Sequence, residues 1–101
     1  MPSTEVTPTE NSLPLSARPR LSAHVRLVFD EVRGHHVLLA PESVMVLNAT
    51  GAAVLRLCQG QSTLAGIVRE LSRRYDHVIV DEVRNFLTRL AARRYLEAGR
   101  D

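Results

Sequence analysis

The chain has 101 residues, of which 45% are hydrophobic, and a formal net charge of +2. This length fits one small domain, which can bury a modest core but no large substrate cavity. No apolar stretch approaches the roughly 20 residues that a membrane-spanning helix needs, so we expect no membrane contact. All 13 cationic residues are arginines, but 11 acidic residues lie among them along the chain, which argues against a nucleic-acid partner.

Residues 1–22 are predicted to form a disordered, proline-rich N-terminal tail. Four of the five prolines lie there, with Ser, Thr and Glu between them and little apolar periodicity. A secretory signal would show a basic segment followed by an apolar one, and this pattern is absent, so we expect a cytoplasmic location. We therefore assign residues 23–101 to the folded domain.

Residues 24–29 are predicted to form the first strand. Val25, Leu27 and Phe29 occupy every second position, and their apolar character at this spacing is typical of a half-buried strand. We expect these three side chains to face the core.

Two further strands are predicted to complete an antiparallel meander. Gly34 can adopt the positive φ that a hairpin turn often requires, so residues 35–40 are expected to pair with the first strand. Pro41 lacks an N–H group and interrupts the ladder. Residues 43–47, rich in Val and Leu, then read as the third strand.

Three helices are predicted after the sheet, at residues 49–59, 64–75 and 82–94. Asn48 and Thr63 stand before the first two, where a side-chain oxygen can accept a hydrogen bond from a free backbone amide. The predicted fold class is therefore α+β, winged-helix-like, with a three-stranded antiparallel sheet followed by three helices. The apolar spacing i, i+3, i+4, i+7 assigns the following side chains of the second and third helices to the core: Leu64, Ile67, Val68, Leu71, Val83, Phe86, Leu87 and Leu90.

The chain shows no set of residues that is typical of catalysis. Cys58 lies on the apolar face of the first helix, which favours a buried thiol over a nucleophile. His35 and His36 are neighbours in a strand, so they point to opposite faces and are poorly placed to bind one ion. Glu42 has no second carboxylate near it, and we expect it to bond turn amides. We expect no enzymatic activity, no cofactor and no metal site.

The third strand gives the main functional hypothesis. If strand order follows chain order, residues 43–47 form an edge strand, and no charge or proline between Val44 and Leu47 hinders pairing. The edge either accepts a guest strand or is covered by the third helix or a second copy of the chain. About four backbone hydrogen bonds at about 1 kcal/mol each fall short of the roughly 8 kcal/mol of micromolar binding, so guest side chains would also have to enter a groove.

A series of motifs extends from the second strand to the third helix. It consists of Leu-Leu-x-Pro-Glu, a strand ending in Leu-Asn, a helix ending near Gly, and an acidic residue followed by Val-x-x-Phe-Leu. The matching positions are Leu38, Leu39, Pro41, Glu42, Leu47, Asn48, Gly60, Val83, Phe86 and Leu87. With these motifs, residues 24–96 resemble the PqqD family, the small peptide chaperones of pyrroloquinoline quinone (PQQ) biosynthesis. The chain departs from the family at two positions: Glu82 stands where the family has Asp, and Gly66 stands where the family usually has a polar or acidic residue.

The resemblance implies a non-catalytic recognition element for a ribosomally made precursor peptide. The PqqA-like peptide would lie beside the third strand and against the third helix. It would be presented to a PqqE-like radical S-adenosylmethionine enzyme that cross-links its Glu and Tyr. The expected contacts are the edge strand, a helical stripe and an arginine for an acidic group of the peptide: Val44, Met45, Val46, Leu47, Arg84, Leu87, Thr88, Ala91 and Arg94. The oligomeric state stays open between monomer and homodimer.

The alternative is a DNA-binding winged-helix regulator. The second and third helices could form a helix-turn-helix in which Arg84, Asn85 and Arg89 face bases. The long connection at residues 76–80 and the negative charge of Glu82 argue against this reading. Salt dependence would separate the two functions, because phosphate binding weakens steeply with salt.

Overall fold

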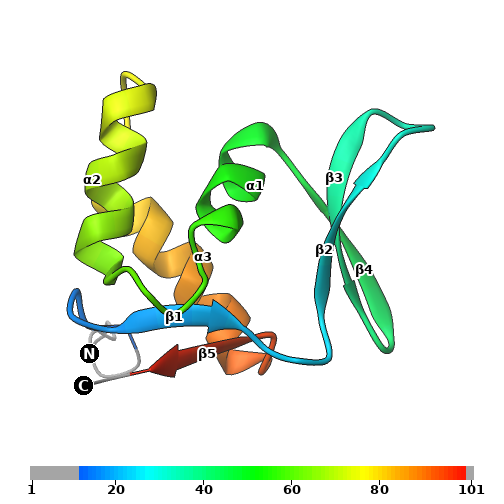
Figure 1. Cartoon of the computed structure of the whole chain (residues 1–101), viewed down its shortest axis with the longest axis horizontal. Coiled ribbons are helices and arrows are strands. Elements are labelled where there is room, and N and C mark those ends of the chain that lie inside the picture. The colour runs from blue at the N-terminus through cyan, green and yellow to red at the C-terminus, as the bar shows by residue number, and fades with distance from the viewer. Residues whose placement is uncertain (1–11, 100–101) are drawn as a thin grey trace, which may run out of the picture.

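The computed structural model describes residues 12–99, and Figure 1 shows its helices on one side of a twisted three-stranded sheet. The elements in chain order are β1 (Arg18–Leu21), β2 (Arg26–Asp30), β3 (His35–Ala40), β4 (Ser43–Leu47), α1 (Ala49–Arg56), α2 (Leu64–Arg74), α3 (Val80–Ala92) and β5 (Leu96–Gly99). The α+β class is confirmed. The winged-helix label fits only loosely, because β1 and β5 form a second, two-stranded sheet.

The predicted meander is confirmed as a sheet with the order β2-β3-β4, antiparallel throughout. Within residues 12–99 no strand pairs with the outer edge of β4. The inner face of the sheet packs against the helices through side chains such as Leu38 and Leu47. Phe29 was expected in the core but is 48% exposed. It lies near the turn of the β2–β3 hairpin, where its ring and the His36 ring pack edge to face with their centroids 4.9 Å apart.

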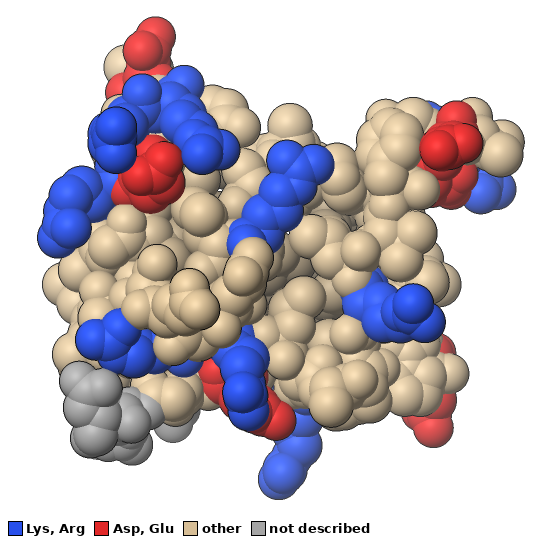
Figure 2. Space-filling view, viewed as in Figure 1, with Lys and Arg blue, Asp and Glu red and all other residues tan. Residues whose placement is uncertain are grey.

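Charged side chains are distributed over several elements. Figure 2 shows basic groups at separate places on the face in view, some of them with acidic groups beside them. On α2, for example, Glu70 pairs with both Arg73 and Arg74. Among the described residues this face therefore shows no single basic surface.

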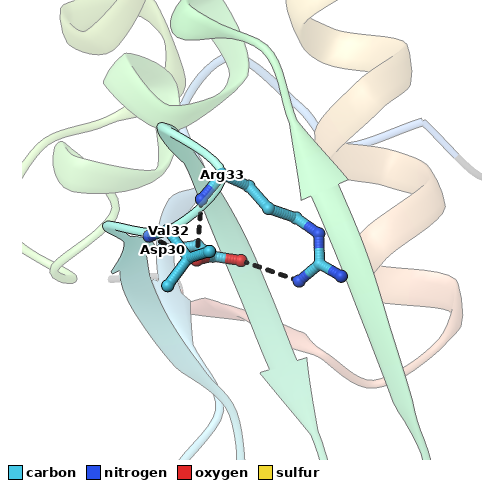
Figure 3. Close-up of polar contacts among 3 residues, drawn as sticks. All are labelled: Asp30, Val32 and Arg33. Atoms are coloured by element: carbon cyan, nitrogen blue, oxygen red, sulfur yellow. Dashed lines mark hydrogen bonds and ion pairs between the residues drawn. The ribbon is translucent and has the colours of Figure 1, made fainter.

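The β2–β3 turn is held by polar contacts of Asp30, which Figure 3 shows. One carboxylate oxygen accepts hydrogen bonds from the amides of Val32 and Arg33, at 3.0 and 3.2 Å, and the other pairs with the Arg33 guanidinium at 3.3 Å. The hydrogen bond from the Arg33 amide is the main cause that lowers the pKa of Asp30. Gly34 completes the turn with φ of 77°, as predicted.

Both predicted helix caps are confirmed. The Asn48 side chain accepts a hydrogen bond from the Gly51 amide at 2.7 Å, and Thr63 accepts one from Gly66 at 3.0 Å. The first helix is shorter than predicted, because it ends at Arg56 and the chain then turns to form a bridge between Gln59 and β1.

The third helix begins earlier and ends earlier than predicted. It starts at Val80 instead of residue 82 and ends at Ala92. Arg94 has φ of 66°, a left-handed conformation that ends the helix and turns the chain into β5. At the end of β5, Gly99 pairs with Arg18 of β1, and residues 100 and 101 lie outside the described residues.

The predicted tail over residues 1–22 is wrong for residues 12–22, while residues 1–11 lie outside the described residues. Leu13 and Ala17 belong to the core, and β1 follows directly. The carbonyl groups of Ala17 and Leu15 accept hydrogen bonds from the first two amides of α2, Leu64 and Ala65, at 2.8 and 3.0 Å. The segment therefore satisfies amides that the start of a helix leaves free.

The core lies between the inner face of the three-stranded sheet and the helices. Its largest fully buried side chains include Leu38, Leu55, Leu64, Ile67, Leu71, Leu87 and Leu90. The buried faces predicted for α2 and α3 are confirmed, except that Phe86 is only half-buried against this core. No helix among residues 12–99 is long and apolar enough to cross a bilayer.

Candidate functional site

A groove of about 380 Å³ runs along the free edge of β4. Its walls come from β4, the start of α1, the connection between α2 and α3, and the first half of α3. The lining residues are Met45, Val46, Leu47, Asn48, Thr50, Gly51, Val54, Tyr75, His77, Val78, Ile79, Glu82, Val83 and Phe86.

The deepest residues of the groove are apolar. Leu47, Val54 and Val83 are 4%, 1% and 6% exposed, and Phe86 is half-buried. A Cβ atom at Gly51 would lie 3.1 Å from the capping oxygen of Asn48 and 3.6 Å from the Phe86 ring. A side chain at this position would therefore crowd the Asn48 cap and contact the Phe86 ring, and glycine leaves this space open.

The mouth of the groove combines apolar and polar groups. Ile79 and Tyr75 are 53% and 37% exposed. Glu82 is the only residue with a formal charge among the described residues that line the groove. It lies in the first turn of α3, where a carboxylate is stabilised by the helix dipole. The groove thus suits an apolar guest and offers no arginine to an acidic one.

The edge of β4 presents two residues whose backbone groups point outward. Ala40 and Ser43 are paired across a two-residue turn, and such a closing pair exchanges both of its hydrogen bonds. Bonded and non-bonded pairs alternate along an antiparallel ladder. Met45 is therefore bonded to β3, whereas the N–H and C=O groups of Val44 and Val46 face away from it. These groups are available to a guest strand.

The predicted strand contacts lie at this site. Met45, Val46 and Leu47 line the groove. Val44 lies just beyond it, with its side chain 62% exposed on the outer face of the sheet.

The predicted helical contacts do not lie in the groove. The Arg84 guanidinium donates a hydrogen bond from Nε to the Leu13 carbonyl at 2.8 Å, and Thr88 accepts one from the Leu13 amide at 3.2 Å. Both side chains therefore hold the N-terminal segment against α3. Leu87 is fully buried in the core, and Ala91 packs against it.

Arg94 also lies away from the groove. Its carbonyl accepts a hydrogen bond from the Ser22 hydroxyl at 2.7 Å, and it lines a separate hollow beside β5. The α3 residues that do line the groove, Glu82, Val83 and Phe86, were not among the predicted peptide contacts. A signal for them existed, because all three belong to the acidic-Val-x-x-Phe-Leu motif.

The thiol of Cys58 lies outside the groove. Burial raises the pKa of the Cys58 thiol from 9.0 to about 12, which keeps it protonated. Residues 12–99 contain no group of three or more His, Cys, Asp or Glu side chains that could hold a metal ion. What the arrangement offers is binding of an extended, apolar segment.

Comparisons with known proteins agree with this arrangement. Residues 35–96 match the family model described as coenzyme PQQ synthesis protein D (PqqD). The chain is 44% identical over 82 residues to the bifunctional coenzyme PQQ synthesis protein C/D of Methylorubrum extorquens, covering 78% of this chain and 22% of that protein. It is 36% identical over 81 residues to a PqqA binding protein of Rhizobium meliloti, covering 77% of this chain and 83% of that relative.

A shorter match of 45% identity over 56 residues, with a PqqA binding protein of Methylococcus capsulatus, covers 55% of this chain and 60% of the relative. The chain thus spans less than two thirds of this relative and about a fifth of the bifunctional protein.

Two solved structures have a similar fold. The solution NMR structure of the PqqD truncation of Methylobacterium extorquens PqqCD, a stand-alone recognition element for ribosomally synthesized, post-translationally modified peptides, has a TM-score of 0.67 at 44% identity. The match covers 78% of this chain and 87% of that one. A heterocyclase with substrate and cofactor has a TM-score of 0.57 at 24% identity, over 80% of this chain and 10% of its own, and supports the fold alone. The family model covers more than half of the sequence, and the chain belongs to the PqqD family.

Proposed function

We propose that this chain is a non-catalytic chaperone that binds the PqqA precursor peptide of PQQ biosynthesis at the groove beside β4. One observation carries the proposal: a free strand edge runs alongside an apolar groove of about 380 Å³. An unpaired edge with a side-chain groove beside it is the arrangement used for strand addition. The relatives named PqqA binding protein support PqqA as the guest.

Strand addition and side-chain burial together account for useful affinity. About four backbone hydrogen bonds contribute roughly 4 kcal/mol. Burying two apolar side chains in the groove adds about 1.5–3 kcal/mol each. The sum approaches the roughly 8 kcal/mol of micromolar binding before ordering costs, so both contributions are needed.

The bound peptide is then presented to a modifying enzyme, which we infer to be a PqqE-like radical S-adenosylmethionine enzyme that cross-links Glu and Tyr of the peptide. The chain supplies an edge and a groove and no catalytic constellation of its own among the described residues. The bifunctional relative supports a role beside another protein of the pathway, since its name joins synthesis proteins C and D in one polypeptide.

An amide-resolved NMR titration with synthetic PqqA peptide tests the proposal, with a nonspecific DNA duplex in a parallel series. We expect the peptide alone to shift the amides of β4 and of groove residues such as Ile79, Glu82 and Phe86. Raising the salt concentration should change the peptide affinity little. Shifts with DNA alone, centred on Arg84, Asn85 and Arg89, would contradict the chaperone function and favour the DNA-binding regulator.

A further inference from the structure

We propose that two copies of this chain pack face to face through the outer faces of their three-stranded sheets. The outer face consists of the side chains of β2, β3 and β4 that point away from the helices. The two copies are related by a two-fold axis that crosses the strands at the level of Val37. The inference is independent of peptide binding, because this contact uses the face of the sheet and leaves the edge of β4 free.

The register of the sheet identifies the outer face. Side chains of residues that pair across an antiparallel sheet project to the same face, and successive residues alternate between faces. Leu38 belongs to the core, so its neighbour Val37 projects outward. The outer side chains form three rows across the sheet: Arg26, Leu39 and Val44; Val28, Val37 and Val46; and Asp30 with His35.

The outer face is apolar, although helices cover only the other side of the sheet (Figure 1). The uncovered face of an antiparallel sheet is commonly polar. Here the middle row consists of valines alone, and Val44 and Val46 are 62% and 63% exposed. Val37 is only 7% exposed, yet it lies outside the core cluster of the described residues. An exposed apolar surface of this kind marks a contact with another protein.

The charges of the outer face favour a second copy as the occupant. Arg26 and Asp30 lie on this face at opposite ends of β2, about 13 Å apart by the rise of a strand, with Val28 between them. A two-fold axis across the strands turns one sheet end for end over the other. Arg26 of each copy then faces Asp30 of the other, and the two valine rows meet. The face is thus complementary to itself, as a two-fold interface requires.

A two-fold axis along the strands is disfavoured. It would lay β2 of one copy over β4 of the other, and Arg26 would face Val44. The guanidinium would then lose hydration against an apolar side chain without gaining a partner. Twisted sheets pack with their strands about 30° from aligned, which the axis across the strands allows. That axis therefore satisfies both the apolar row and the charges.

Both charged groups are available for this contact. Arg26 is exposed and forms no hydrogen bond or ion pair within the described part of the chain. The Asp30 carboxylate has about four acceptor positions. Its contacts with Val32 and Arg33 in the turn use three of them. One position is left for an arginine of the second copy.

The size of the outer face predicts a weak, reversible dimer. Three strands of five or six residues, each about 17–20 Å long and about 4.8 Å from the next, form the whole contact. This contact is well below the roughly 800 Å² per partner of a stable interface. The dimer should therefore form only as the protein concentration is raised.

Sedimentation velocity of the full chain, from about 5 µM to about 500 µM, tests the proposal. The average mass should rise with concentration from 11.2 kDa toward twice this value. Arg26→Asp places two carboxylates opposite each other at both ends of the interface, and should raise the dimer dissociation constant about tenfold. Val28→Asp puts a charge into each valine row and should weaken the dimer at least as much.

Two control variants make the same chemical changes outside the interface. Arg69→Asp changes an exposed arginine of α2, and Val80→Asp changes a valine of α3 that is 40% exposed, close to the 37% of Val28. Both variants should dimerise as the parent chain does. Thermal unfolding at low concentration, followed by circular dichroism, shows whether each variant is folded. If Val28→Asp is unfolded, Arg26→Asp alone decides.

Each other result has a distinct meaning. A parent chain that stays monomeric at the highest concentration would overturn the proposal, including in favour of a different protein on this face. A dimer that survives both Arg26→Asp and Val28→Asp uses another surface, which would overturn the assignment of the outer face. Loss of the dimer in Val28→Asp but not in Arg26→Asp would overturn the direction of the two-fold axis. Titration of Arg26→Asp with PqqA peptide should match the parent chain, and a failure of peptide binding in both would refute only the proposed function.

Discussion

Replacing Val46 by proline should separate peptide binding from folding. Proline removes the Val46 N–H, which points to the free edge of β4, so the sheet loses no hydrogen bond of its own. The φ of proline is compatible with an edge strand, and the Val46 side chain is already 63% exposed. We therefore expect the free energy of unfolding to change by less than about 1 kcal/mol.

The affinity for PqqA peptide should fall strongly in the same variant. One guest carbonyl loses its donor, at a cost of about 1–3 kcal/mol when it cannot find another partner. This corresponds to a dissociation constant about 5-fold to 150-fold larger. Calorimetric titration of the peptide and thermal unfolding followed by circular dichroism measure the two quantities on the same sample.

Two control variants make the result interpretable. Val46→Thr keeps the amide and the branched shape, and should bind peptide as the parent chain does. Met45→Pro removes an amide that bonds to β3 as well as a half-buried side chain. It should destabilise the fold by about 2 kcal/mol, roughly 10 °C in melting temperature. If Val46→Pro unfolds the protein as Met45→Pro does, the assigned phase of the ladder is wrong, and if it binds peptide normally, β4 is not the docking strand.

Three other predictions concern residues around and outside the groove. Arg84→Ala should lower the free energy of unfolding by about 1 kcal/mol, because the hydrogen bond to Leu13 is lost, and should speed hydrogen exchange at the start of α2. Peptide affinity should not change, and a marked loss of affinity would restore Arg84 as a peptide contact. Glu82→Gln should tighten binding of a peptide that carries Asp in the groove by about twofold to fivefold at low salt, and no effect would remove Glu82 from the site. Cys58 should resist iodoacetamide at pH 8 in the folded chain and react once it is denatured. Because its pKa rises from 9.0 to about 12 on folding, the free energy of unfolding should fall as pH increases through this range, and a flat profile would contradict the burial.

Much of the fold was predictable because its signals are local. The caps at Asn48 and Thr63 depend on one side chain and an amide three residues away. The turn at Gly34 depends on the conformation of that residue. The buried faces of α2 and α3 follow from helical periodicity, which is a property of the sequence once a helix forms.

The N-terminal segment could not be predicted in this way. Its proline-rich composition is typical of a disordered chain, and the sequence has no local pattern for a strand at residues 18–21. What orders the segment comes from distant elements: β5 pairs with β1, the start of α2 donates to Leu15 and Ala17, and α3 holds Leu13. Partners so far along the chain are determined by packing and leave no periodic trace in the segment itself.

The same distinction between local signals and contacts with distant elements applies to the candidate site. The sequence by itself determined that residues 43–47 form an apolar strand without a charge or proline, since strand propensity and turn chemistry are local. Only the tertiary structure decided which side of α3 faces that strand. Successive helical residues are turned by about 100°, so the stripe beginning at Arg84 and the side carrying Glu82, Val83 and Phe86 are both plausible from sequence. The packing of Leu87 and Leu90 into the core and of Leu13 against Arg84 fixes the rotation of the helix, and that rotation directs Phe86 into the groove.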